Sequence, residues 1–150
     1  MASTLTKLLI HVTFSTKHRA ATIPQALEPN LYAYIGGICR RMESPLLAMG
    51  GVADHVHLLV SLSKTVTLSE LMLNIKRDSS KWIKDQDPAL AGFAWQDGYF
   101  AFSLGESGAA ALKTYIAHQK EHHKTVAFKD EVLLLLAKYG IQYDERYVWE

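Results

Sequence analysis

The sequence predicts an α+β protein, a ferredoxin-like β-α-β-β-α-β sandwich with an antiparallel sheet, followed by further C-terminal helices. Two runs of apolar and β-branched residues, 46–52 and 55–62, follow each other closely, which is typical of a hairpin. Apolar residues recur at helical spacing on both sides of this pair. A strand-like run lies at each end of the pattern, and together these observations indicate the split arrangement.

The composition is that of one folded protein. Of the 150 residues, 49% are hydrophobic and 21% are charged, which suits one domain with a sizeable core. The net charge of +1 gives no compositional argument for a nucleic-acid partner. The single Cys39 excludes an internal disulfide and fits the cytosol. No signal peptide is visible, and the longest apolar run, 132–137, is too short to span a membrane. We therefore expect a soluble cytoplasmic protein.

The first part of the chain predicts a strand and a helix. Residues 8–14 are rich in side chains that suit a half-buried sheet, and the polar, basic stretch 15–19 after them indicates a loop. Pro24 is a residue type that opens helices, and apolar side chains then recur at helical spacing up to Arg41. The hairpin follows, with its turn expected near residues 53–54.

A second helix follows the hairpin. Thr67 is a candidate N-cap, and Glu70 three residues later completes a capping box. The predicted core stripe of this helix consists of Leu68, Leu71, Met72, Ile75 and Trp82. Its opposite side carries the basic residues Arg77, Lys81 and Lys84.

The remaining chain predicts one strand and two helices. The strand runs from about Tyr99 to Leu104, and the glycine-containing stretch 105–108 separates it from a helix over 109–124. The last helix spans about 129–139 and is stopped by Gly140. The aromatic tail is expected to dock on the domain.

Two histidines in the hairpin give the first sign of chemistry. Successive strand side chains alternate between faces, so His55 and His57 lie on the same face, about 6 to 7 Å apart along the backbone. This geometry suits one divalent metal ion. The plain alternative is a chance pair on a half-exposed strand.

A possible third ligand lies on the helix over 109–124. Tyr115 and Gln119 are four residues apart and therefore neighbours on one helical face. A glutamine amide oxygen is a hard ligand suited to Mg²⁺ or Mn²⁺. By themselves, a tyrosine and a glutamine at this spacing also fit ordinary helix packing.

Taken together, these features make the sequence similar to the HUH single-tyrosine transposases, bacterial insertion-sequence and REP-associated enzymes that cut single-stranded DNA. The resemblance covers essentially the whole chain. It is carried in matching order by residues 9–19, 54–60, 75–81, 95–103, 115–119 and 139–144. Arg77 departs from the small residue expected in the family's Lys-Gly-x-Ser-Ser pattern, which leaves the DNA contacts of that helix open.

The resemblance implies a role for each chemistry-bearing residue. His55 and His57 would be paired metal ligands, Gln119 the third ligand, and Tyr115 the nucleophile on a C-terminal catalytic helix. The implied cofactor is a divalent metal, Mg²⁺ or Mn²⁺. Residues 1–150 would form a single HUH tyrosine transposase domain.

The implied reaction is metal-dependent cutting and rejoining of single-stranded DNA beside hairpins. Attack by Tyr115 would give a 5′-phosphotyrosine link and a free 3′-hydroxyl, and transesterification would later reverse the step without ATP. The resemblance also implies a homodimer in which the tyrosine helix can complete the partner's site. Single-stranded DNA with hairpins is the expected substrate.

Several other polar residues are candidates for DNA contacts. His122 follows Tyr115 by seven residues and so shares its helical face. Exposed charges are also commonly no more than a solvated surface. The main candidates are Lys17, Arg19, Arg77, Lys81 and His122, and Arg40, Arg41 and Lys84 are further candidates for phosphate contacts. We expect His11 on the first strand to be structural rather than a ligand.

Two other functions fit the same sequence. One is a domesticated, non-transposing relative that binds or nicks repeat hairpins in its host genome. The other is a ferredoxin-like module that binds a metal or nucleic acid and catalyses no reaction.

Overall fold

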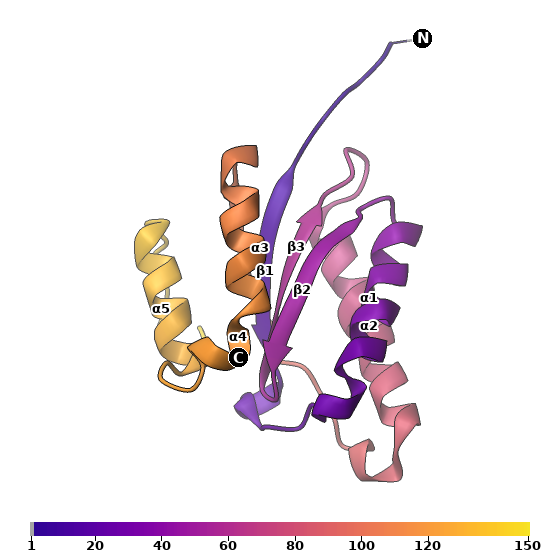
Figure 1. The fold of residues 1–150 in the computed structure, drawn as a ribbon, viewed down its shortest axis with the longest axis vertical. Coiled ribbons are helices and arrows are strands. Elements are labelled where there is room, and N and C mark those ends of the chain that lie inside the picture. Colours follow the sequence, from indigo (N-terminus) through magenta and orange to yellow (C-terminus); the bar gives the residue numbers. More distant parts are fainter. Residues whose placement is uncertain (1) are drawn as a thin grey trace.

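The computed structural model describes residues 2–150 and shows a four-stranded antiparallel sheet between two layers of helices (Figure 1). The strand order is β2-β3-β1-β4. Helices α1 and α2 cover one face, and α3, α4 and α5 lie over the other (Figure 1). The predicted ferredoxin-like arrangement is therefore confirmed.

The strands agree closely with the sequence prediction. They are β1 (Leu9–Ser15), β2 (Leu46–Val52), β3 (His55–Ser61) and β4 (Phe100–Leu104). β3 pairs with both β1 and β2, which makes it an interior strand. All seven of its residues except Ser61 are buried, because helices cover both of its faces. Interior position and burial together hold β3 rigidly.

Alternation along β3 divides its side chains between two environments. Val56, Leu58 and Val60 belong to the main core beneath α1 and α2. Leu59 packs against α3 on the opposite face. His55 and His57 share that second face, as the period of two requires.

The helices over the main core are α1 (Glu28–Arg41) and α2 (Leu68–Gln86). A 3-10 turn follows Pro24, so the α-helix begins four residues later than Pro24 would suggest, at Glu28. The predicted cap of α2 is confirmed, since the Thr67 side chain accepts a hydrogen bond from the Glu70 backbone N–H at 3.1 Å. Ile83 fills the core position expected for Trp82, whose ring stacks beside Tyr34 instead.

The predicted continuous helix over 109–124 is wrong in one respect. The chain forms α3 (Ala109–Ala117) and a short α4 (Gln119–His122), separated by a break at His118. Contacts of the residues after the break outweigh their helix propensity. Gln119 is buried, and the Lys120 ammonium lies 2.7 Å from the Glu28 carboxylate and 3.1 Å from the Gly51 carbonyl oxygen.

The last helix is α5 (Phe128–Lys138), and Gly140 ends it with a φ of +64°, as predicted. Phe128, Val132 and Leu136 pack against Phe102 of β4. The aromatic tail docks on the same cluster through Val148 and Trp149, which confirms the expectation that it folds back. Of the helices in residues 2–150, none is long and apolar enough to cross a membrane.

Candidate metal centre and nucleophile

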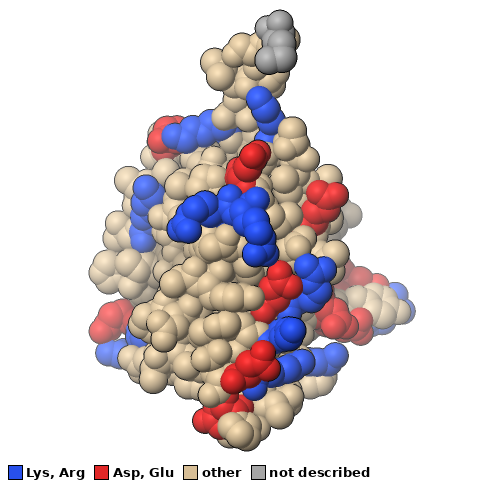
Figure 2. All heavy atoms as spheres, turned by 90° about the vertical axis from the view of Figure 1, so that its right-hand side faces the viewer, with Lys and Arg blue, Asp and Glu red and all other residues tan. Residues whose placement is uncertain are grey.

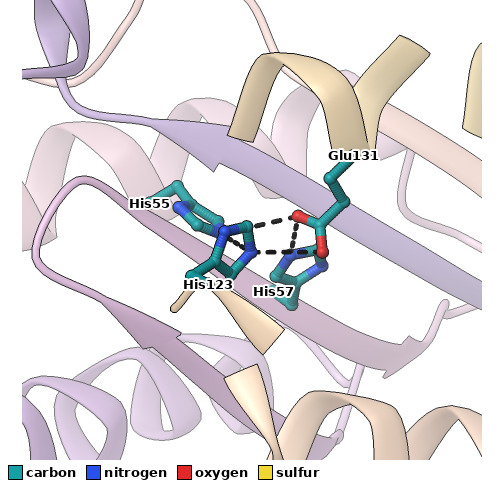
Figure 3. A group of neighbouring side chains, drawn as sticks. All are labelled: His55, His57, His123 and Glu131. Carbon is teal, nitrogen blue, oxygen red and sulfur yellow. Dashed lines mark hydrogen bonds and ion pairs between the residues drawn. The ribbon is translucent and has the colours of Figure 1, made fainter. Parts of the chain in front are cut away.

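The centre of the site is a buried group of three imidazoles and one carboxylate (Figure 3). His55 and His57 come from β3, His123 follows α4, and Glu131 lies on the first turns of α5. One potential ligand atom from each residue lies within 4.8 Å of all the others. His55 and His57 are fully buried, so the pair is not the chance exposed pair considered above.

The distances among these side chains are those of direct polar contacts. The His55 Nε2 lies 2.9 Å from the His123 Nε2 and 3.5 Å from a Glu131 carboxylate oxygen. The His57 Nε2 lies 2.8 Å from the same oxygen. The second Glu131 oxygen lies 3.2 Å from the His123 Nε2. These atoms converge on one small volume.

Two further contacts orient the β3 histidines. The His55 Nδ1 lies 2.7 Å from the Asp54 carboxylate, and the His57 Nδ1 lies 2.8 Å from the His11 Nε2. Each contact occupies the Nδ1 of its ring and leaves the Nε2 directed into the cluster. A carboxylate partner, such as Asp54 behind His55, is common for metal-ligating histidines. His11 was expected to be structural rather than a ligand, and it contacts His57 from outside the group of four.

The structure also brings Gln119 and Tyr115 to this centre. The Gln119 Oε1 lies 3.3 Å from the His55 Nε2, and its amide nitrogen lies 3.5 Å from Glu131. The Tyr115 hydroxyl donates to Glu131, and its ring lies 5.7 Å from the His57 ring. Of the DNA candidates, His122 joins them, with its Nε2 3.1 Å from Glu131. The chemistry-bearing residues predicted from sequence thus meet in one place.

The electrostatics follow from burial and from the single carboxylate. Burial opposes ionisation of Glu131, but hydrogen bonds from the surrounding histidines outweigh it and hold the pKa of the carboxyl well below its ordinary value. Burial and the contact with Glu131 raise the pKa of Tyr115. Burial lowers the pKa of His11 to about 3 and also lowers the pKa of His57. Contacts with Asp54 and Glu131 instead raise the pKa of His55, against the effect of its burial. A buried carboxylate surrounded by imidazole nitrogens is an arrangement that suits a cation.

The basic DNA candidates lie elsewhere. Arg77 and Lys81 are on α2, across the sheet from the histidines, and line a hollow of about 670 Å³ between α2 and residues 94–99. The Arg77 guanidinium is engaged by Asp78 and Asn74. Figure 2 shows the side of the molecule that carries α1 and α2, where basic and acidic side chains are interspersed.

Lys17 and Arg19 lie in the 3-10 turn after β1, apart from both the histidine cluster and the α2 residues. The Lys17 ammonium lies 3.8 Å from Asp97, and the Arg19 guanidinium lies 5.8 Å from the Trp149 ring. They line a small hollow with the C-terminal residues, and neither reaches the histidine cluster.

Sequence reasoning missed two members of the centre, His123 and Glu131. The sequence signal for Glu131 was a charge on the apolar stripe of its helix, between Phe128 and Leu136. A charge on such a stripe is costly unless it is paired, so it indicates a polar partner across the fold. His123 carried no comparable signal, because its position depends on the break after α3.

Comparison with solved structures shows which proteins share this fold. The fold is that of transposases of known structure. A putative transposase from Deinococcus radiodurans R1 superimposes with a TM-score of 0.62 at 21% identity, over 79% of this chain and 95% of that one. A REP-associated tyrosine transposase bound to a REP hairpin superimposes with a TM-score of 0.61 at 15% identity, over 84% of this chain and 76% of that one.

The sequence comparison names the family. A family model described as Transposase IS200 like matches residues 4–119. The transposases for insertion sequence element IS200 from Salmonella typhimurium and Salmonella typhi are each 24% identical over 119 residues, covering 76% of this chain and 78% of theirs. The chain belongs to the IS200-like transposases, which confirms the HUH single-tyrosine family expected from the sequence.

The family match ends at Gln119. It includes the two β3 histidines and Tyr115, whereas His123 and Glu131 lie beyond it. The centre therefore combines a part inside the matched region with a part contributed by the C-terminal segment.

Proposed function

We propose that this transposase is a metal-dependent enzyme that cuts and rejoins single-stranded DNA beside hairpins through Tyr115. The observation that supports this most directly is the convergence of the Tyr115 hydroxyl with a buried histidine and carboxylate cluster. A nucleophile and a cation site must meet at one phosphate for such chemistry. A module without a reaction has no need for this meeting.

The residues fit a divalent ion. The His55 and His57 Nε2 atoms are available as ligands when each Nδ1 carries the proton and donates it to Asp54 or His11. Gln119, His123 and Glu131 surround the same volume and supply oxygen and nitrogen donors. Mixed imidazole and oxygen donors suit Mn²⁺, and the oxygen donors alone suit Mg²⁺. The bound ion would supply positive charge for the scissile phosphate and for the Tyr115 phenolate.

Tyr115 is proposed as the attacking group. Its oxygen gives up its proton and forms a bond to the phosphorus of the scissile phosphodiester while the bond from that phosphorus to the 3′ oxygen breaks. The 3′ oxygen takes up a proton and leaves as a hydroxyl, so the number of protons is unchanged overall. The product is a 5′-phosphotyrosine link. The reverse attack by a 3′-hydroxyl rejoins a strand and frees Tyr115, so no other energy source is consumed.

Two contacts support a site completed by the chain's own tyrosine helix. A Cβ at Gly50 of β2 would lie 2.4 Å from the Ile116 carbonyl oxygen, so only glycine lets α3 approach this closely. The Lys120 contacts with Glu28 and Gly51 hold α4 against α1 and β2. The homodimer implied by the resemblance stays a proposal, and the molecular mass in solution measures it.

Hairpin DNA is the proposed substrate, since one structural relative is bound to a REP hairpin. The test is incubation of purified protein and Mn²⁺ or Mg²⁺ with single strands from the DNA flanking its gene. A covalent adduct that survives denaturation is expected with wild type and is lost in Tyr115→Phe. Equal adduct in both proteins, or none in wild type on any flanking strand, would contradict the proposal.

The flanking DNA also separates transposition from a domesticated activity. Terminal palindromes bounding the gene are expected for a mobile element. Repeats scattered elsewhere in the genome would favour a protein that nicks host hairpins. Both share the chemistry proposed for Tyr115, so the adduct assay alone does not divide them.

A further inference from the structure

A cavity of about 460 Å³ lies between α3 and α5 and reaches the proposed nucleophile. Its inner end is formed by polar side chains of the site, His11, Tyr115 and Glu131. Its walls are apolar, from Leu104 and Leu112 on one side and Leu135 on the other. The mechanism proposed above uses the inner end and leaves the rest of the cavity without a role.

Tyr139 gives one wall of the cavity a flat aromatic surface. Its ring is stacked on Phe102 of β4, with centroids 4.8 Å apart and an interplanar angle of 25°, which fixes its orientation. About 38% of Tyr139 and 69% of the neighbouring Leu134 are exposed, so the cavity is open rather than an internal packing gap. A fixed aromatic face beside open space suits a planar ligand.

The mouth of the cavity carries positive charge. Lys138 lines it, with its ammonium 5.5 Å from the centre of the Tyr139 ring. Within residues 2–150, Lys138 forms no ion pair. An unneutralised ammonium next to an apolar, aromatic slot matches a nucleotide, whose phosphate is anionic and whose base is planar.

We propose that this cavity receives one unpaired nucleobase adjacent to the phosphodiester that Tyr115 attacks, with Lys138 contacting the neighbouring phosphate. The inference rests on the proposed function, because it takes single-stranded DNA as the ligand. Insertion of the base would fix the strand on both sides of the reacting phosphate. Stacking in the slot accepts any base, so the contact positions the strand without reading its sequence.

The test measures binding separately from cleavage. Hairpin-bearing single strands from the gene's flanks carry 2-aminopurine at each unpaired position in turn, and its fluorescence reports a base that leaves solvent. Ala111 is an exposed residue of α3 that lines the cavity, so Ala111→Trp fills the slot from its edge. Ala110→Trp is the matched control, since Ala110 is exposed on the same helix and does not line the cavity.

One labelled position is expected to change fluorescence with wild type and Ala110→Trp but not with Ala111→Trp. Binding to Ala111→Trp should be weaker by roughly tenfold, the order of one lost base stack. No such position in wild type, or the same response in both tryptophan variants, overturns the inference. The adduct assay on the same strands keeps the two proposals apart. Adduct without a responding position contradicts base binding in the cavity and leaves the Tyr115 chemistry standing. A responding position without adduct contradicts the Tyr115 chemistry and, with it, the placement of the base beside the cleaved phosphate.

Discussion

The Tyr115 hydroxyl donates a hydrogen bond to the Glu131 carboxylate, which lies on α5. This contact joins the residue expected to attack DNA to the buried anion of the histidine cluster. The same carboxylate lies within 3.5 Å of His55 and within 2.8 Å of His57. Glu131 is thus shared between the nucleophile and the proposed metal ligands, and its removal should affect both.

Glu131→Gln keeps the shape of the side chain and removes its charge. We expect Mn²⁺ affinity, measured by calorimetry, to fall by about tenfold or more, since supporting and ligating groups at metal sites contribute on this order. Glu121→Gln is the matched control, because Glu121 is exposed on α4 and, within residues 2–150, forms an ion pair with Lys124 alone. An affinity equal to that of wild type would remove Glu131 from the metal site.

Acid should destabilise the metal-free protein in a defined window. The pKa of His11 is lowered from 6.5 to about 3. Between these pH values the unfolded chain therefore binds a proton on His11 that the folded protein does not bind. The free energy of unfolding therefore falls as the pH drops from 6.5 towards 3. The lowered pKa of Glu131 acts in the same direction below the ordinary carboxyl range.

Chemical denaturation in a chelator at several pH values checks this. His11→Gln should make the pH dependence shallower by up to about 1.4 kcal/mol per pH unit, the value of one proton. His18→Asn is the matched control, because His18 is exposed outside the cluster and asparagine tolerates its φ of +57°. A His11→Gln slope that matches wild type would show that this ring titrates normally in the folded protein.

Gly50→Ala should weaken the packing of α3 against β2. Its Cβ would meet the Ile116 carbonyl oxygen at 2.4 Å, and backbone in a packed layer moves only at a cost of about 1–3 kcal/mol. The measurement is the midpoint of chemical unfolding together with adduct yield, and both should fall. Gly37→Ala in α1 has open space around its Cβ and should raise stability by about 0.5–1 kcal/mol.

A mixing experiment tests whether each site is completed within one chain. Tyr115→Phe and His57→Gln are co-expressed with different tags and assayed for adduct. If α3 stays on its own sheet, the mixture forms no more adduct than the two variants do separately. Recovery of a substantial fraction of wild-type adduct would mean that partner chains exchange the tyrosine helix.

Local signals predicted most of the fold. The predicted hairpin strands agree with the structure to within one residue, because the strand alternation and the turn depend on residues adjacent in sequence. The α2 cap was predicted correctly because Thr67 and Glu70 are three residues apart. The break at His118 was missed, since it depends on Glu28 and Gly51, which bind Lys120 from other elements. Local propensity carries no information about such partners.

The candidate site also combines features predictable from residues close in sequence with features that depend on tertiary contacts. His55 and His57 were paired from strand geometry, and Tyr115 with Gln119 from helix geometry, but their meeting was implied only by the family resemblance. His123 and Glu131 reach the cluster through the break after α3 and the turn into α5. No spacing rule connects residues in different elements, so the position of these two beside the β3 histidines emerged only with the tertiary structure.

The two faces of β3 separate the support of the centre from its cover. Val56, Leu58 and Val60 are held in the main core, and this fixes the direction of the two histidines that alternate with them. His123 and Glu131, which complete the centre, are carried by the segment beyond the family match. A change in that segment would therefore alter the surroundings of the histidine pair without disturbing the core contacts that orient it.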